Sequence, residues 1–152
     1  MSQEEPAAPE SSEVRRRSRP RPAITHDNEF FWRGVQEGKL LIQRCSCGRL
    51  RHPPGPMCPV CHSLEWDSVE ASGRGSVYSF VVAHHPPIPP FEYPNLIVLV
   101  ELAEGTRIVS NLRNVDPAEV EVGMPVQAEF VEIEEGRNFL QFEPIRSGRD
   151  TE

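Results

Sequence analysis

The chain has 152 residues, a formal net charge of −7 and a hydrophobic content of 38%, with 16 prolines. This length allows one domain or a small module joined to a small barrel, and the low apolar content indicates that part of the chain is unpacked. Residues 63–152 carry six arginines against sixteen acidic residues, a balance of −10, whereas residues 26–62 are slightly basic. Such an acidic C-terminal part disfavours general nucleic-acid binding, which depends on Lys and Arg.

Residues 1–24 are polar, rich in proline and free of aromatic residues, so we predict a disordered tail there and a second one over 146–152. The arginine cluster at 15–21 precedes a polar stretch, "PAITHDNEFF", rather than the apolar segment of an export signal. No run of about 18 apolar residues occurs, so we expect no membrane span. We therefore expect a cytoplasmic location, with the thiols in a reducing compartment.

A lead-in helix is predicted over 25–38, since a Thr or Asp precedes it, an acidic residue follows in its first turn and a glycine ends it. Phe31 and Val35 share one face and favour packing in a core. Because Phe30, Phe31 and Trp32 are consecutive, at least one of them must face away from the core. Phe30 and Trp32 are therefore candidates for contact with a partner or a substrate.

All four cysteines lie in "IQRCSCGRLRHPPGPMCPVCHS", as two close pairs separated by a proline-rich turn. Two such pairs form the tetrahedral thiolate site that structural zinc prefers, so we predict a zinc ribbon over 39–64 that holds one Zn²⁺. The candidate ligands are Cys45, Cys47, Cys58 and Cys61. The first pair is spaced C-x-C rather than C-x-x-C, which leaves zinc occupancy open, with His52 or His62 as an alternative ligand or no metal at all.

Short strand-like runs then follow over 65–145, among them "GSVYSFVVAH", "NLIVLVEL" and "NFLQFEPI", separated by turn sequences rich in Gly, Pro and Asn. We expect a mainly β chain whose strands close into a small barrel, because closure removes exposed strand edges. A single helical turn is expected at 116–119, where an Asp precedes a Pro.

The helix and ribbon sequence "FFWRGVQEGKLLIQRCSCGRLRHPPGPMCPVCHS" and the later motifs "GRGSVYSFVVAHHPPIPPFEYP" and "VGMPVQAEF" resemble the acyl-CoA-associated OB-fold family, also described as domain of unknown function thirty-five. The resemblance covers roughly residues 27–145. It implies a rubredoxin-like zinc ribbon and a C-terminal OB-fold barrel, with the four cysteines as metal ligands. It also implies an accessory role beside thiolase-like enzymes of lipid metabolism, some of which cleave steroid side-chain CoA esters by retro-aldol chemistry.

Two groups of residues are candidates for that role. The loop "HHPPIPPFEYP", residues 84–94, is stiff and apolar, which suits partner docking or the wall of a ligand tunnel, although it is equally compatible with packing on its own barrel. Its candidate residues are His84, His85, Phe91 and Tyr93. The basic residues of the ribbon suit the phosphates of coenzyme A, or else are paired with acids or solvated. They are Arg44, Arg49, Arg51 and His52.

The sequence thus predicts a non-catalytic accessory subunit that binds a thiolase-like lyase or acyltransferase, shares its acyl-CoA ligand and is inactive alone. No nucleophile beside a base, phosphate loop or redox-cofactor motif is recognisable. A nucleic-acid-binding ribbon and OB-fold protein is the alternative, and the acidic C-terminal part argues against it. The sequence leaves open the partner, the acyl group and the stoichiometry.

Overall fold

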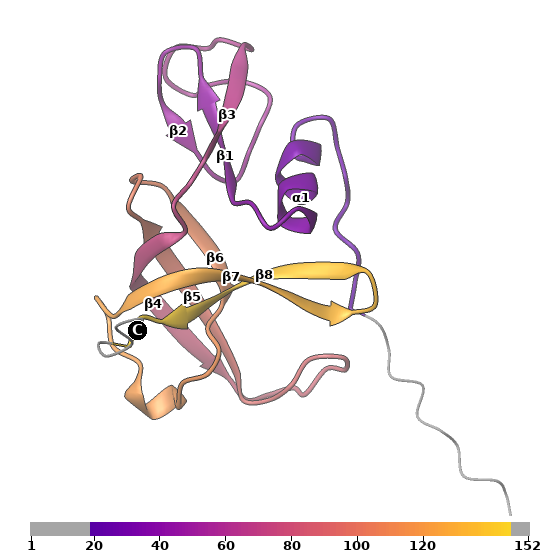
Figure 1. The fold of residues 1–152 in the computed structure, drawn as a ribbon, viewed down its shortest axis with the longest axis vertical. Coiled ribbons are helices and arrows are strands. Elements are labelled where there is room, and N and C mark those ends of the chain that lie inside the picture. The colour runs from indigo at the N-terminus through magenta and orange to yellow at the C-terminus, as the bar shows by residue number, and fades with distance from the viewer. Residues whose placement is uncertain (1–18, 147–152) are drawn as a thin grey trace, which may run out of the picture.

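The structure is a computed structural model that describes residues 19–146; the rest of the predicted tails, 1–18 and 147–152, lies outside the described residues. One helix, a small ribbon and a larger curved sheet follow one another along the chain (Figure 1). The elements are α1 (Glu29–Gln36), β1 (Leu41–Cys45), β2 (Leu50–Arg51), β3 (Trp66–Glu70), β4 (Arg74–Ala83), β5 (Asn95–Leu102), β6 (Arg107–Asn111), the 3₁₀ turn η1 (Pro117–Glu119), β7 (Pro125–Glu134) and β8 (Arg137–Pro144). Within the described residues, neither helical segment has the length and apolar character needed to span a bilayer.

Helix α1 is shorter than the predicted range 25–38, and its N-cap is Asn28 rather than the expected Thr or Asp. The Asn28 side-chain oxygen accepts a hydrogen bond from the Thr25 amide at 2.8 Å, which fixes the turn that leads into the helix. The helix ends as predicted at a glycine. Gly38 has φ +73°, so its own amide and the next one bond back to carbonyls of the last turn at 3.2 and 2.8 Å.

The ribbon is a three-stranded antiparallel sheet in the order β2-β1-β3. Gln43, at the centre of β1, is a polar side chain that is only 1% exposed. Its amide exchanges two hydrogen bonds with the backbone of Gly55, both 3.0 Å long. Because both ends of the buried amide are satisfied, Gln43 ties the proline-rich turn between the cysteine pairs to the central strand.

The larger sheet has the order β6-β5-β4-β7-β8, and all its neighbours are antiparallel. The prediction of a mainly β chain with short antiparallel strands is confirmed, and so is the helical turn, where Asp116 caps the amide of Ala118 at 2.9 Å. The expected closed barrel is not formed. Just beyond β6, a single isolated bridge joins Leu112 to Phe142 of β8, and the two edge strands of the sheet do not pair along a ladder.

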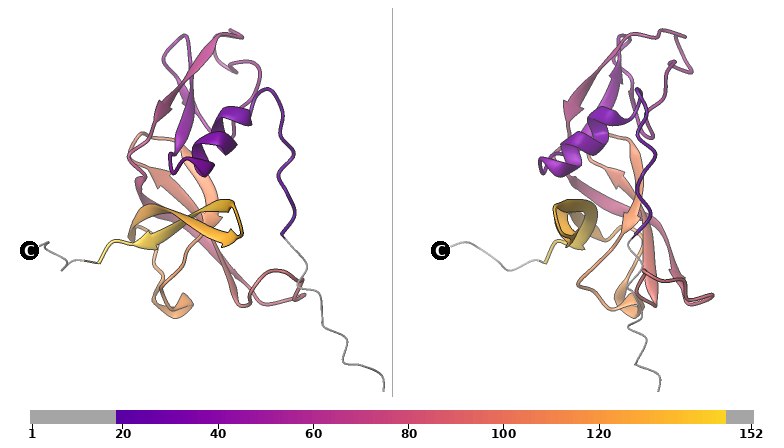
Figure 2. Two further views of the ribbon diagram at one scale, coloured as in Figure 1. Left: turned by 45° about the vertical axis from the view of Figure 1, so that its right-hand side comes forward. Right: turned by 90° about the vertical axis from the view of Figure 1, so that its right-hand side faces the viewer.

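Helix α1 lies between the ribbon and the β7–β8 hairpin, beside the curved sheet (Figures 1 and 2). Phe31 and Val35 are buried in the core, as predicted from their shared face. Gln36 fixes the helix to the hairpin through Asn138, with three hydrogen bonds of 3.0 to 3.1 Å between their side chains and backbones. The helix therefore links the ribbon to the sheet and defines the space between them.

The segment before α1 makes contacts earlier than the predicted tail boundary of residue 24. The amide of Arg19 donates to Glu134 at 2.6 Å, and Arg137 donates to the Arg19 carbonyl at 3.0 Å. The Arg19 guanidinium also lies over the rings of Phe91 and Phe139, 5.3 Å from each centroid. These contacts are with residues far along the chain, so the local composition of the segment could not reveal them.

A candidate metal centre and an adjoining groove

The four cysteines converge at one end of the ribbon, as the sequence predicts. Their sulfur atoms all lie within 4.8 Å of one another, with Cys45 and Cys58 buried and Cys47 and Cys61 exposed. The Cys45–Cys61 sulfur distance is 3.4 Å and the Cys47–Cys58 distance is 3.9 Å. Four sulfurs placed tetrahedrally at about 2.3 Å from a zinc ion would be about 3.8 Å apart, so this donor set fits a Zn²⁺.

Local backbone geometry allows the unusual C-x-C pair to join the cluster. Strand β1 ends at Cys45, and the chain then turns through Gly48, whose φ of +86° lets its amide donate to the Cys45 carbonyl at 2.7 Å. The second turn is closed by the His62 amide, which donates to the Cys58 carbonyl at 3.0 Å. His62 therefore contributes its backbone to the turn, and the metal-site cluster is formed by sulfur alone.

Backbone amides around the cluster favour thiolates at two of the cysteines. The amides of Cys61 and Val60 lower the pKa of Cys58 to about 6, and the amide of Cys47 lowers the pKa of Cys45. The amide of Ser63 acts in the same direction on Cys61, but donation from the Cys61 thiol to the Cys45 sulfur, together with burial, raises the pKa of Cys61 to about 12. Four negative charges cannot coexist at this distance without a cation, which a bound metal would supply.

The basic residues predicted to bind phosphate are not equally available. Arg44 forms a double hydrogen bond with Asp67, at 2.8 and 2.6 Å, and this contact lowers the pKa of that carboxyl group. Arg51 donates to the carbonyls of Gly55 (at 2.6 Å) and Met57 and so holds the turn of its own ribbon. Arg49 is exposed on the surface of the ribbon. Of these arginines, Arg49 alone presents a guanidinium to a ligand without breaking a contact described above.

His52 lies on the other side of the ribbon, against α1. Its ring is 5.0 Å from that of Phe31, at an interplanar angle of 47°. Burial lowers the pKa of His52 to about 4, so the imidazole is neutral near pH 7. A neutral, buried imidazole does not offer the positive charge that a phosphate needs, and His52 instead forms part of a groove.

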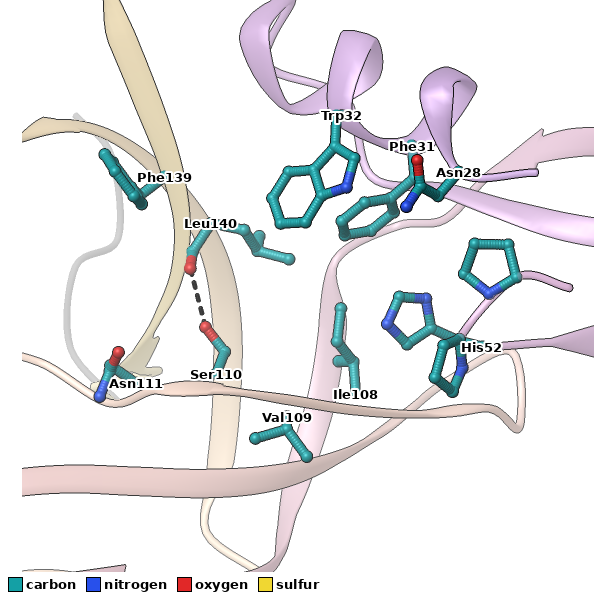
Figure 3. Close-up of a pocket in the computed structure, with 12 residues that line it drawn as sticks. Asn28, Phe31, Trp32, His52, Ile108, Val109, Ser110, Asn111, Phe139 and Leu140 are labelled. Carbon is teal, nitrogen blue, oxygen red and sulfur yellow. Dashed lines mark hydrogen bonds between the residues drawn. The ribbon is translucent and has the colours of Figure 1, made fainter. Parts of the chain in front are cut away.

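This groove of about 410 Å³ lies where helix, ribbon and sheet meet (Figure 3). Phe31 and Trp32 reach into it from α1, and Ile108, Phe139 and Leu140 come from β6 and β8. Polar groups stand at its sides, and the Ser110 hydroxyl among them donates to the Leu140 carbonyl at 2.7 Å. A mainly apolar groove with a few polar groups is the common form of a small-molecule site.

Sequence reasoning missed the sheet residues of this groove. Phe139, Leu140 and Ile108 read in the sequence as ordinary strand residues, and only the long-range docking of α1 brings them to Trp32. The two candidate residues of the helix, Phe30 and Trp32, differ in burial. Phe30 is 7% exposed, with its ring 5.0 Å from that of Trp66, so it is a core residue rather than a partner contact. Trp32 remains partly exposed and lines the groove.

The loop of residues 84–94 joins β4 to β5 and projects from the sheet away from the ribbon (Figures 1 and 2). Its histidines, His84 and His85, are exposed, whereas Phe91 and Tyr93 are half-buried. None of the four lines the groove beside α1. The loop nevertheless comes near one end of the groove, because the Arg19 guanidinium lies over both Phe91 and the groove residue Phe139.

Comparison with known proteins accounts for both parts of the fold. Residues 32–67 match the family described as "ChsH2, rubredoxin-like zinc ribbon domain", and residues 68–131 match the family described as "ChsH2, C-terminal OB-fold domain". The chain is 47% identical over 112 residues to the "3-oxo-4,17-pregnadiene-20-carboxyl-CoA hydratase alpha subunit" of Mycobacterium tuberculosis, which covers 74% of this chain. The chain spans only 36% of that relative's length, and 40% of that of a second hydratase alpha subunit.

Other relatives are closer to this chain in length. It is 36% identical over 100 residues to a "DUF35 domain-containing scaffold protein" of Pyrococcus furiosus, covering 64% of this chain and 73% of the relative. A solved chain of the "Ltp2-ChsH2(DUF35) aldolase" aligns with a TM-score of 0.78 and 51% identity, over 82% of this chain and 98% of that one. These similarities confirm the resemblance noted in the sequence: the chain belongs to the DUF35 family of zinc-ribbon and OB-fold proteins, in its ChsH2 branch.

Proposed function

We propose that this chain is a non-catalytic accessory subunit that binds a thiolase-like enzyme and helps to form its acyl-CoA site. The observation that carries the proposal is the similarity to a chain of the Ltp2-ChsH2(DUF35) aldolase, at 51% identity over 98% of that chain. The name "scaffold protein" of the Pyrococcus furiosus relative supports the same role.

The side chains described here support an accessory role. The four thiols are the strongest nucleophiles of the chain, and they converge on one another rather than on a base. His84 and His85 are both exposed in a loop, outside the groove that could hold a ligand. The groove does contain the neutral His52 imidazole and the Ser110 hydroxyl, but His52 packs on Phe31 and the Ser110 hydroxyl donates to the Leu140 carbonyl. Within residues 19–146, no hydrogen bond joins these two groups as a nucleophile and its base.

We infer that the four cysteines hold one structural Zn²⁺. A bound zinc would supply the cation that lets all four thiols ionise, and a site of four sulfurs leaves no open position for substrate. The two turns that carry the cysteines have few apolar residues, so metal binding would replace a hydrophobic core in stabilising the ribbon.

The groove beside α1 and Arg49 would serve the ligand. The groove is mainly apolar, as an acyl chain requires, and Arg49 is the free guanidinium of the ribbon, suited to a phosphate of coenzyme A. The Mycobacterium tuberculosis relative is named for a steroid-derived CoA ester. A bulky, apolar steroid side-chain CoA ester, cleaved by retro-aldol chemistry in the partner, is therefore the acyl-CoA that we propose.

The test uses the full chain and a thiolase-like enzyme that co-purifies with it from its own cells. Each protein alone and the mixture are given steroid side-chain CoA esters, and consumption of the thioester is followed by chromatography, with an unrelated zinc-ribbon protein as control. We expect no turnover by this chain alone, and turnover by the mixture that exceeds that of the enzyme alone at least about tenfold. Equal turnover with and without this chain would rule out the accessory role.

A further inference from the structure

The outer face of β4, β5 and β6 carries apolar side chains that do not reach the core. In β5, Ile97 and Leu99 point outward, between the buried inward residues. Val81 of β4 stands directly opposite Ile97, and Val109 of β6 stands directly opposite Leu99. Val81 is 58% exposed and Val109 is 66% exposed. Together with Tyr78 of β4, these four residues form what we call the outer patch, and none of the five belongs to the core cluster or packs against it.

A β-bulge in β4 adds Tyr78 to this face. The pairing of β4 with β5 shifts between Val77 and Ser79, so Tyr78 is the extra residue. The shift reverses the alternation, because Val77 is buried inward whereas Ser79 stands on the outer face. The Arg107 guanidinium, which lies 3.5 Å from the centre of the Tyr78 ring, also binds Glu101 at 3.3 Å.

The sequence of β5 has the composition of a strand covered on both sides. An antiparallel sheet with one solvated face normally alternates apolar and polar residues, whereas the central part of β5, "LIVLV", is apolar at inward and outward positions alike. Figure 3 shows Val109 and Ile108 on opposite sides of β6, with Ile108 towards α1. The outer patch and the groove beside α1 therefore meet at β6, where Val109 belongs to the patch and also borders the groove.

The chemistry of the outer patch fits another protein. In OB folds, the second and third strands form a face that can bind nucleic acid, but this requires basic and stacking side chains. Here the patch is mainly aliphatic, and its arginine is paired with Glu101. A second copy of this chain fits poorly, since each copy has a net charge of −7 and residues 63–152 alone have −10, so apposed sheets would repel.

We propose that the outer patch is the surface on which the partner enzyme docks, through an uncharged apolar surface of that enzyme. The inference rests on the proposed accessory function and adds which face of the OB sheet is used. A partner docked there would reach the edge of the groove at Val109, so an acyl-CoA in the groove could contact both proteins. The loop 84–94 connects β4 to β5, two of the strands that carry the patch, and it contains a further exposed apolar residue, Ile88.

The experiment measures the dissociation constant between the full chain, with its metal, and the thiolase-like enzyme. Val81→Glu and Val109→Glu each place a charge in the outer patch. Val122→Glu is the matched control, because Val122 is 68% exposed but lies in a turn outside the OB strands. We expect each patch variant to weaken binding at least about tenfold and the control to stay within about twofold. Circular dichroism checks that all three variants fold.

Each other outcome has a distinct meaning. Tight binding by the wild type and by both patch variants would overturn the patch inference and leave the accessory role standing. Absence of wild-type binding would overturn both the proposed function and this assignment. Light scattering on the chain alone would then show whether Val81→Glu splits a dimer, which would assign the patch to a second copy. Loss of oligonucleotide binding in the same variant would assign it to nucleic acid instead.

Discussion

His52 lies where the ribbon, the helix and the sheet meet, and its burial there changes its pKa. Its ring packs against Phe31 in the groove, and burial lowers its pKa from 6.5 to about 4. Between these two values the unfolded chain binds a proton that the folded chain does not bind. Stability from the neutral imidazole is therefore complete above pH 6.5 and is lost as the pH falls towards 4.

We predict that His52→Gln flattens this pH dependence. Between pH 6.5 and 5 the wild type should lose up to about 2 kcal/mol of unfolding free energy more than the variant, since each pKa unit corresponds to about 1.4 kcal/mol. Urea unfolding at several pH values measures the difference. Because both proteins carry the same cysteines, subtracting the curves removes the effect of metal loss in acid. Parallel curves would show that His52 titrates normally in the folded chain.

At the scale of residues, the sequence predicted which side chains could bind a metal or a phosphate better than it predicted which groups those side chains contact. The four cysteines could be assigned to one cluster, because two close pairs on short turns constrain where the sulfurs lie. Arg44 and Arg51 looked like phosphate ligands in the sequence, and the structure engages them with Asp67 and with the ribbon carbonyls. Such partners lie 4 to 23 residues away in the chain, beyond the reach of local patterns.

The elements followed the sequence closely where hydrophobic periodicity was strong. Six of the predicted strand runs coincide with β3 to β8, whereas the two-residue β2 gave no signal. The bulge at Tyr78 was not predicted, because one extra residue in a long apolar run leaves the composition unchanged. Barrel closure was expected because it removes exposed strand edges, but whether the two edge strands meet depends on long-range contacts that the strand sequences do not specify.

We expect the ribbon to depend on its metal for stability, whereas the OB sheet does not. The ribbon strands have five residues at most, and the cysteine turns contribute only sulfur to the interior. We predict that Cys58→Ser removes the zinc and destabilises the ribbon, with the β signal of the sheet in circular dichroism largely retained. Metal analysis should give about one zinc per chain for the wild type and none for the variant. Nitrogen in the first shell by X-ray absorption would instead support a histidine ligand.

For the whole molecule, the structure shows three features that the order of residues did not reveal together. The cysteines cluster in the ribbon, the groove beside α1 is mainly apolar, and the outer patch meets the groove at Val109. Arg49 stands apart from these, as an exposed guanidinium on the ribbon. If the ribbon helps to hold coenzyme A, replacing Arg49 should remove that contribution without unfolding the ribbon.

We predict that Arg49→Ala raises the KM of the assembled enzyme for acyl-CoA several-fold while kcat and complex formation stay unchanged. A guanidinium–phosphate contact acts equally on bound substrate and transition state, so its loss appears in KM. Arg44→Ala, which breaks the pair with Asp67 on the same ribbon, serves as the matched control and should leave KM unchanged. Substrates lacking the 3′-phosphate of coenzyme A identify the contact: if Arg49 binds that phosphate, wild type and variant become equal, and if it binds the pyrophosphate, the difference persists. An unchanged KM with the intact substrate would exclude Arg49 from the acyl-CoA site and leave the ribbon with a purely structural role.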